Sequence, residues 1–275
     1  MTSRYMRNIS ICAAALLLAV SGVGCGKGAE TQEDITAETD ENVAVNENGG
    51  DPSESNGEDN AVTVTSTSDP DAIKSRNIDI PALAAENEEI FGWLTVPGTD
   101  IDCPILQSAI ADDFYMTHNS KKEADESGAL YIEMANMTNM CDFNTVIHGN
   151  GGEKGLFREL VNFENPDFFD ENETFYIYID GDVLTYEIWG CMERDNTSLI
   201  RTYDFTYASG CRQFMEDVYE SKIVGKQIRN GWEQLSEYNF MVTLTIDDPD
   251  SDRQLVVYGT LIEDPAGIID RVIEE

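Results

Sequence analysis

Basic residues are scarce in this chain of 275 residues, which has 17 lysines and arginines against 53 aspartates and glutamates. The resulting formal charge of −36 argues against nucleic acid as a partner, because its phosphates would be repelled. The same repulsion opposes electrostatic docking on anionic lipid. The charge therefore favours cationic partners, although only weakly.

The cysteines of the predicted domain also lack the close spacing of metal-binding motifs. Cys103, Cys141, Cys191 and Cys211 are widely separated and match no zinc pattern such as C-x-x-C. We expect no bound cofactor. An exported location would permit disulfides, whereas cysteines inside apolar stretches are typically buried free thiols, so the spacing leaves both states open.

The first 24 residues predict an export signal. Arg4 and Arg7 precede an apolar run over residues 9–20, which is too short for a permanent membrane span. Small residues then lead into Cys25 and resemble the lipobox of bacterial lipoproteins, in which the cysteine is acylated and becomes the new N-terminus. Gly22 departs from the leucine usual in that family. An uncleaved anchor or an ordinary signal peptide is the alternative.

Residues 25–77 predict an acidic, disordered tether. No lysine or arginine occurs between Lys27 and Lys74, and such a segment has too little apolar surface to offset its ordering entropy. About 50 flexible residues span on the order of 40 Å. We expect a domain held outside the cytoplasm, at the outer face of the cytoplasmic membrane, by a lipid anchor. A specific acidic binding tail is the alternative.

Residues 78–264 predict one mostly β domain, followed by a tail over residues 265–275. Short apolar segments separated by turn residues indicate a closed antiparallel barrel with accessory helices. Asp180-Gly181 is a hairpin signal between two of the strands. The expected helices are 79–90, a turn at 112–118 and 207–222. The expected strands are 93–96, 101–106, 129–133, 144–148, 174–179, 183–192, 239–246 and 253–262.

Several motifs in family order resemble class B sortases. The stretch G-W-L-T-V-P-G-T at residues 92–99 looks like their G-W-x-x-[IV]-P-G-T opening, and I-D-C-P-I-L-Q at 101–107 is similar to I-x-Y-P-[IV]-x-Q. F-Y-M-T-H at 114–118 resembles Y-Y-L-x-H, and N-T-V-I at 144–147 resembles the strand before the catalytic histidine. The resemblance implies a sortase-like barrel with an N-terminal helix and an accessory helix before the last two strands.

The resemblance also implies three catalytic positions, a cysteine, a histidine and an arginine. Asp247 ends T-L-T-I-D at the cysteine position, and Asn150 occupies the histidine position of the Y-G-H-N turn. Arg253 matches the arginine. His148 is a displaced candidate for the acid, although its place in an alternating strand favours a satisfied, partly buried histidine. An ion pair between Asp247 and Arg253 could fill the former site.

A carboxylate is a weak nucleophile toward amides, and an amide side chain cannot transfer a proton, so we expect no transpeptidation. The leading hypothesis is an inactive surface protein that binds a sorting-signal peptide, a wall protein or a sortase partner. The alternatives are a transpeptidase or peptidase with relocated residues and a purely structural protein. Asp248, Asp250 and Asp252 are weak calcium candidates that lack the glycine and glutamate of a full calcium loop.

Overall fold

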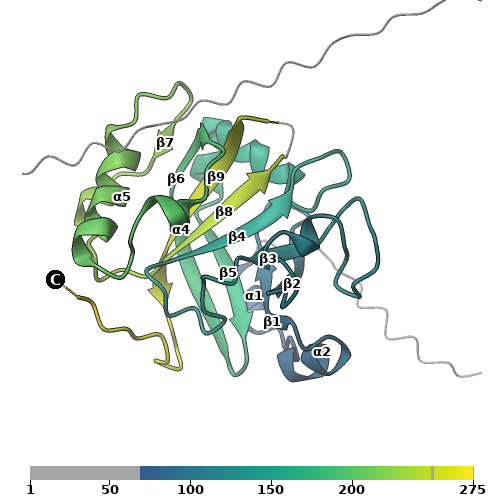
Figure 1. Cartoon of the computed structure of the whole chain (residues 1–275). Helices are drawn as coiled ribbons and strands as arrows, with labels where there is room; N and C mark the ends of the chain where they lie inside the picture. The colour runs from purple at the N-terminus through teal and green to yellow at the C-terminus, as the bar shows by residue number, and fades with distance from the viewer. Residues whose placement is uncertain (1–68, 249–250, 275) are drawn as a thin grey trace, which may run out of the picture. The chain divides into compact units, whose positions relative to one another are not determined.

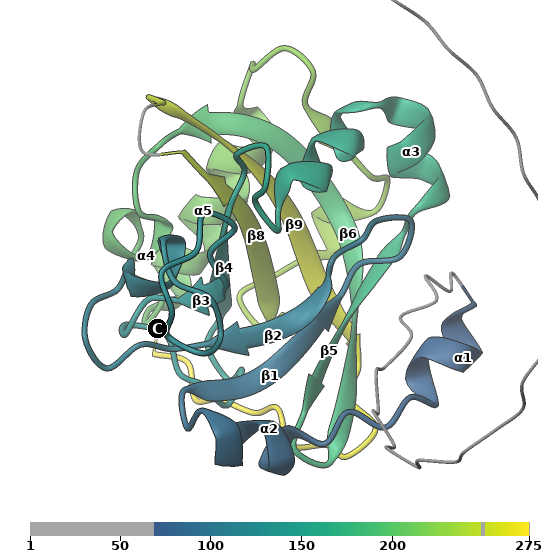
Figure 2. The same ribbon diagram turned by 90° about the vertical axis from the view of Figure 1, so that its right-hand side faces the viewer.

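Eight strands close into a barrel in the computed structural model, which describes residues 69–248 and 251–274. The described part of the chain has nine strands, of which all but β7 belong to the barrel: β1 (Ile90–Thr95), β2 (Asp102–Leu106), β3 (Leu130–Ile132), β4 (Asn144–Asn150), β5 (Thr174–Ile179), β6 (Asp182–Asp195), β7 (Gln227–Ile228), β8 (Met241–Asp247) and β9 (Arg253–Glu263). Their order around the ring is β5-β1-β2-β3-β4-β8-β9-β6, and β6 pairs with β5 to close it (Figures 1 and 2). The short strand β7 adds to β6 outside the ring.

Two of the pairings differ from the antiparallel arrangement that the sequence predicts. β2 and β3 pair in parallel, and so do β4 and β8, whereas the other neighbours in the ring are antiparallel. Parallel neighbours require a long crossover, and both pairs have one, because residues 107–129 and 151–240 separate their strands. The alternation of apolar residues that predicts strands carries no information on their direction.

The helices lie outside the barrel. They are α1 (Pro70–Lys74), α2 (Ile80–Glu86), α3 (Pro166–Glu171), α4 (Leu199–Thr202) and α5 (Ala208–Glu220), with 3-10 turns η1 (Phe114–Met116), η2 (Arg158–Glu164) and η3 (Trp232–Gln234). The predicted accessory helix is confirmed as α5. The first predicted helix ends at Glu86, earlier than expected, because Ile90 already pairs with Leu106 in the barrel.

Helix α5 explains why the middle of β9 is apolar on both faces. Phe214, at the centre of its buried stripe, packs with Val256 and Tyr258 on the outer side of β9. Val257, the residue between them, belongs instead to the cluster inside the barrel. Successive strand residues point to opposite faces, so a strand covered on both sides needs a continuous apolar run.

The chain begins to pack on the barrel earlier than the sequence predicts. Asp69 caps α1, and Ile73 on this helix is fully buried against Tyr176 and Tyr178. Residues 69–77, which the sequence assigns to the tether, therefore belong to the folded domain. The predicted signal, Cys25 and the rest of the tether lie outside the described residues. Within residues 69–248 and 251–274, no helix has the length and apolar character needed to cross a membrane.

Glu89 anchors the segment that carries η1. The backbone N–H of Ala109 donates to its carboxylate at 2.8 Å, Lys122 Nζ lies 3.1 Å away, and the Tyr115 hydroxyl donates to the same group. The side chain is only 8 % exposed. Desolvation raises the pKa of Glu89, but these three partners outweigh it, and the net shift is downward.

We expect Glu89→Gln to lower the free energy of unfolding at pH 7 by about 1–3 kcal/mol, because a buried charge-assisted network loses its anion. The folded pKa lies below the unfolded one. The contribution is therefore complete above the ordinary glutamate pKa and is lost as pH falls through the lowered value. Urea unfolding between pH 3 and pH 7 would measure both effects. Glu88→Gln, at the exposed neighbouring position, is the control, and equal pH profiles for the two variants would contradict the assignment.

Candidate functional site

A cavity of about 530 Å³ opens where the ends of several strands meet, and we call it the strand-end cavity. It is lined by Asp112, Asp113, Met116, Tyr131, Glu133, Val146, His148, Asn196, Thr197, Ser198, Leu199, Arg201, Thr245, Asp247, Asp248 and Gln254. These residues come from β3 and β8 and the positions directly after them, from β4 and β9, from α4 and the segment before it, and from the loop that carries η1. In Figure 1, α4 lies in front of β4 and β8, and α4 and β4 are in contact.

Strand register brings the central side chains of the cavity together. Tyr131 on β3 is the partner of His148 on β4, which is the partner of Thr245 on β8. Residues opposite one another in neighbouring strands share a face, and so do residues two apart in one strand. Asp247 therefore joins the same row two residues beyond Thr245. The sequence places these groups up to 116 positions apart, and the barrel makes them neighbours.

His148 is held by Asp247. The Nδ1 atom of His148 lies 2.8 Å from Asp247 Oδ2, and the Tyr131 hydroxyl donates to the same carboxylate oxygen at 2.9 Å. The rings of Tyr131 and His148 stack with centroids 5.1 Å apart and planes 15° from parallel. Because a carboxylate only accepts, Nδ1 carries the proton in this hydrogen bond. The expectation of a partly buried histidine with a satisfied ring nitrogen agrees with this geometry for Nδ1.

The other ring nitrogen faces Glu133, which directly follows β3. His148 Nε2 lies 3.6 Å from Glu133 Oε1, close enough for attraction between charges but too long for a hydrogen bond. Ser198 donates to Glu133 Oε1 at 2.9 Å. The histidine, aspartate and glutamate side chains are only 12 %, 16 % and 10 % exposed. One imidazole thus stands between two largely buried carboxylates.

Tyr131 acts in this network as a neutral donor. Burial first, and then the adjacent negative charge of Asp247, raise the pKa of the Tyr131 hydroxyl well above its ordinary value. A phenol held in its protonated form can donate to a carboxylate and offers no nucleophile of its own. Tyr131 therefore serves as a hydrogen-bond donor to the Asp247 carboxylate.

Arg253 lies apart from Asp247. Its guanidinium Nη1 is 2.6 Å from Asp195 Oδ1 on β6, so the Asp247–Arg253 ion pair considered from the sequence is wrong. Gln254, the next residue, lines the strand-end cavity instead, and its Oε1 lies 3.1 Å from the Thr245 hydroxyl. Consecutive residues of a strand point to opposite faces, which puts Arg253 and Gln254 on different sides of β9.

Asn150 is likewise outside the cavity lining. Its amide donates to the backbone carbonyl of Glu126 at 3.0 Å and accepts from the N–H of Gly152 at 2.7 Å. Asn150 thus shapes the turn after β4, although its backbone remains the register partner of Asp247. Of the predicted catalytic positions, the structure brings together His148 and Asp247 only.

No cysteine is among the described residues that line the strand-end cavity. All four cysteines in the described part of the chain are free thiols. Desolvation raises the pKa of Cys103 and of Cys191 to about 12, and it also raises the pKa of Cys211. Cys141 lies beside a different cavity. A thiol with a raised pKa is a poor source of thiolate at neutral pH.

The calcium candidates are only partly described. Asp248 lines the strand-end cavity, and the backbone carbonyl of Asp252 accepts from the N–H of Asn196 at 2.9 Å. Asp250 lies outside the described residues. In the part of the chain that the structure covers, no group of three histidine, cysteine, aspartate or glutamate side chains is placed to hold a metal ion.

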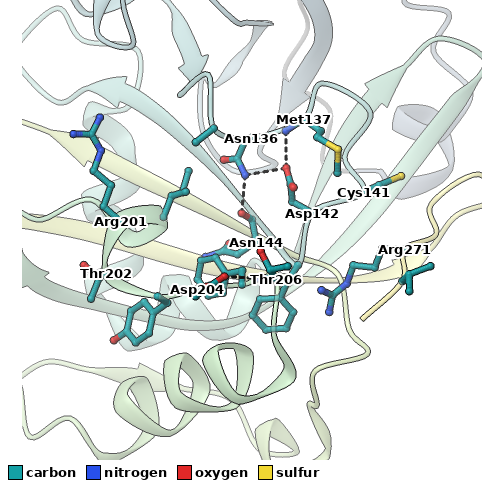
Figure 3. A pocket seen from close by; sticks show the side chains of 16 residues that line it. Asn136, Met137, Cys141, Asp142, Asn144, Arg201, Thr202, Asp204, Thr206 and Arg271 are labelled. Atoms are coloured by element: carbon teal, nitrogen blue, oxygen red, sulfur yellow. Dashed lines mark hydrogen bonds between the residues drawn. The ribbon is translucent and has the colours of Figure 1, made fainter. Parts of the chain in front are cut away.

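Arg201 also lines a second cavity, of about 590 Å³ (Figure 3). Figure 3 shows Arg201 and Arg271 at opposite sides of this space, between the β3–β4 loop, the α4–α5 segment and the C-terminal tail. Polar groups of this cavity stabilise the β3–β4 loop, since Asn136 donates to Asp142 and to the backbone of Asn144. This use of its polar groups within the loop favours the strand-end cavity as the functional site.

Comparisons with known proteins agree with this architecture. No protein-family model matches the chain. Sortase B from Listeria monocytogenes serovar 1/2a is 26 % identical over 180 residues, which are 64 % of this chain and 71 % of that protein. Sortase B from Staphylococcus aureus is 22 % identical over 148 residues, 52 % of this chain and 58 % of that protein.

Solved structures give the same result. A mutant form of Clostridium perfringens sortase B superposes with a TM-score of 0.59 at 27 % identity, covering 66 % of this chain and 86 % of that one. A Staphylococcus aureus sortase B–substrate complex superposes with a TM-score of 0.58 at 18 % identity, covering 67 % and 84 %, and shows the shared fold alone. The closed barrel with an inserted helix is that of a class B sortase. The chain is similar to class B sortases in both sequence and fold, and the family resemblance predicted from its motifs is confirmed.

Proposed function

We propose that this chain is a catalytically inactive class B sortase-like protein that binds an extended peptide segment of a cell-surface partner. One observation carries the proposal: Asp247 stands where the family resemblance puts the nucleophilic cysteine, and it is engaged with His148 and Tyr131 at an open cavity. The candidate segments are a sorting signal, a wall protein or part of a sortase partner.

The chemistry of the strand-end cavity supports inactivity. A carboxylate attacking an amide would form a mixed anhydride that water hydrolyses, and Asp247 is stabilised as an acceptor by two donors. In subtilisin, an unrelated protease, loss of the nucleophile alone removes about 10⁶ in kcat. Gln254, which lines the cavity in place of Arg253, is neutral, so the position of the family arginine contributes no positive charge to the cavity.

The open cavity supports binding. It has polar acceptors and donors at its floor and apolar walls from Met116, Val146 and Leu199. Such a mixture suits a peptide whose backbone and side chains both make contacts. Among the structural neighbours, one is described as a sortase B–substrate complex and one as a Bacillus anthracis sortase B in complex with AAEK1.

Incubating the purified full chain with a panel of sorting-signal peptides tests this proposal. We expect saturable binding by fluorescence anisotropy and peptides of unchanged mass after prolonged incubation. A second candidate function, hydrolysis assisted by the Asp247 and His148 pair, is favoured by their 2.8 Å contact and predicts cleavage that resists thiol alkylation. Cleavage that alkylation abolishes would instead indicate a relocated cysteine. Absence of binding by every peptide would contradict the proposed binding role.

We further propose that the protein is a lipoprotein, acylated at Cys25 and held outside the cytoplasm at the membrane by the acidic tether. The support is the sequence: a basic start, an apolar run and small residues before the cysteine. A domain that binds surface peptides needs such a location.

A further inference from the structure

The strand-end cavity is lined mainly by carboxylates. Five of its lining residues are acidic, namely Asp112, Asp113, Glu133, Asp247 and Asp248, whereas the basic ones are Arg201 and His148. His148 contacts both Asp247 and Glu133, so a single imidazole is shared between two anions. The lining has an excess of negative charge even when His148 is protonated.

Arg201 already places a cation at the rim of this cavity. Its Nη2 lies 3.3 Å from Asp112 Oδ2, and its Nε lies 3.8 Å from Glu133 Oε2. Both distances are longer than the 2.7–2.9 Å typical of strong charged hydrogen bonds, and the side chain is 74 % exposed. Exposed pairs of this kind contribute little stability. A guanidinium from the chain itself thus occupies a position between two carboxylates, and it is loosely held there.

The walls of the cavity suit the aliphatic stem of a long basic side chain. Met116, Val146 and Leu199 supply apolar surface inside it, and lysine and arginine bury their methylene groups against such surface. Beside the rim, Met134 is 53 % exposed, and its backbone N–H donates to Asp112 Oδ1 at 2.7 Å. An apolar contact for the neighbouring residue of a bound segment is therefore available next to the carboxylates.

We propose that the strand-end cavity takes a lysine or arginine side chain of an extended partner segment, which displaces Arg201 from Asp112 and Glu133. The inference rests on the proposed peptide-binding function and names the charge of the residue that is bound. A ligand cation lies deeper than Arg201 and is less exposed to water, so its attraction to Glu133 is less screened. Arg201 acts as an internal competitor.

Three fluorescein-labelled, capped hexapeptides that differ only at one central position test the proposal: lysine, norleucine or glutamate. Capping removes the terminal amine, so only the side chain can supply the cation. With the full chain, we expect the lysine peptide to bind at least 10-fold more tightly than the norleucine peptide and the glutamate peptide to bind most weakly. The lysine preference should decrease as salt concentration rises.

Variants distinguish the competing role of Arg201 from the binding roles of Glu133 and Asp112. Arg201→Ala should tighten binding of the lysine peptide about 3- to 10-fold and leave the norleucine peptide unchanged. Glu133→Gln and Asp112→Asn should each weaken the lysine peptide at least several-fold, and two positions are used in case one variant fails to fold. Arg212→Ala, which removes another exposed arginine that pairs with Glu237, is the matched control and should change nothing.

The outcomes separate failure of the cation site from failure of peptide binding. If the lysine and norleucine peptides bind equally, or if Arg201→Ala weakens the lysine peptide, the inferred cation site is overturned while peptide binding stands. If no peptide binds at any concentration tested, both the cation site and the proposed binding function are overturned.

Discussion

His148→Leu is expected to lower the free energy of unfolding by about 3 kcal/mol, since it leaves two buried carboxylates without the group between them. Asp247 and Glu133 lie on either side of the imidazole, at 2.8 Å and 3.6 Å, and leucine offers neither of them a polar partner. The ring stacked on Tyr131 is also lost. Equilibrium unfolding in urea at pH 7 measures the change.

A double-mutant cycle identifies the cause of this loss. Asp247→Asn removes one of the two charges, so the combined His148→Leu and Asp247→Asn variant should be more stable than His148→Leu alone. His118→Leu is the control, because His118 stacks on Phe114 and its ring contacts a backbone carbonyl, with no carboxylate bridge. A loss at His148 no greater than at His118 would mean that the imidazole does not hold the two carboxylates together.

Cys25→Ala is expected to move the protein almost completely from the membrane fraction to the soluble extracytoplasmic fraction or to leave it unprocessed. Acyl chains contribute about 0.8 kcal/mol per buried methylene, and the acidic tether offers no alternative attraction to anionic lipid. Fractionation followed by mass spectrometry of the N-terminal peptide measures both location and lipid.

The control for this experiment is Cys12→Ala, which alters a cysteine within the apolar run and leaves the small residues before Cys25 intact. It should retain the lipid and the membrane location. If the unaltered chain carries no lipid at Cys25 and keeps an intact N-terminus, the segment is an uncleaved anchor and the lipoprotein proposal is wrong.

Local patterns in the sequence predict much of the barrel. The Asp180-Gly181 turn joins β5 and β6 as expected, with Gly181 at a positive φ of 81°, and the stripe of Cys211, Phe214 and Val218 forms α5. Two helices, α1 and α3, were not predicted although the sequence contains signals for their first residues. Asn165-Pro166 caps and opens α3, as Asp69-Pro70 does for α1, and both pairs are typical helix starts.

The site could be predicted only in part, because it depends on register between distant strands. Asp247 and His148 are found from the motifs that contain them, and both line the cavity. Glu133, Ser198 and Gln254 carry no motif, and they join the cavity through the folding of the barrel and the path of the chain before α4. Choosing Gln254 over Arg253 requires the β8–β9 register, in which Thr245 pairs with Val256. A shift of this register by one residue would place Arg253, in place of Gln254, opposite Asp247.

The most direct test of inactivity is the rate of peptide cleavage and transpeptidation by the full chain and by its Asp247→Ala variant. A catalytically competent sortase B under the same conditions serves as the positive control, and mass spectrometry of the peptide is the readout. We predict that neither form yields product above the no-protein background. Product from the unaltered chain that disappears in the Asp247→Ala variant would contradict inactivity and make Asp247 a catalytic residue.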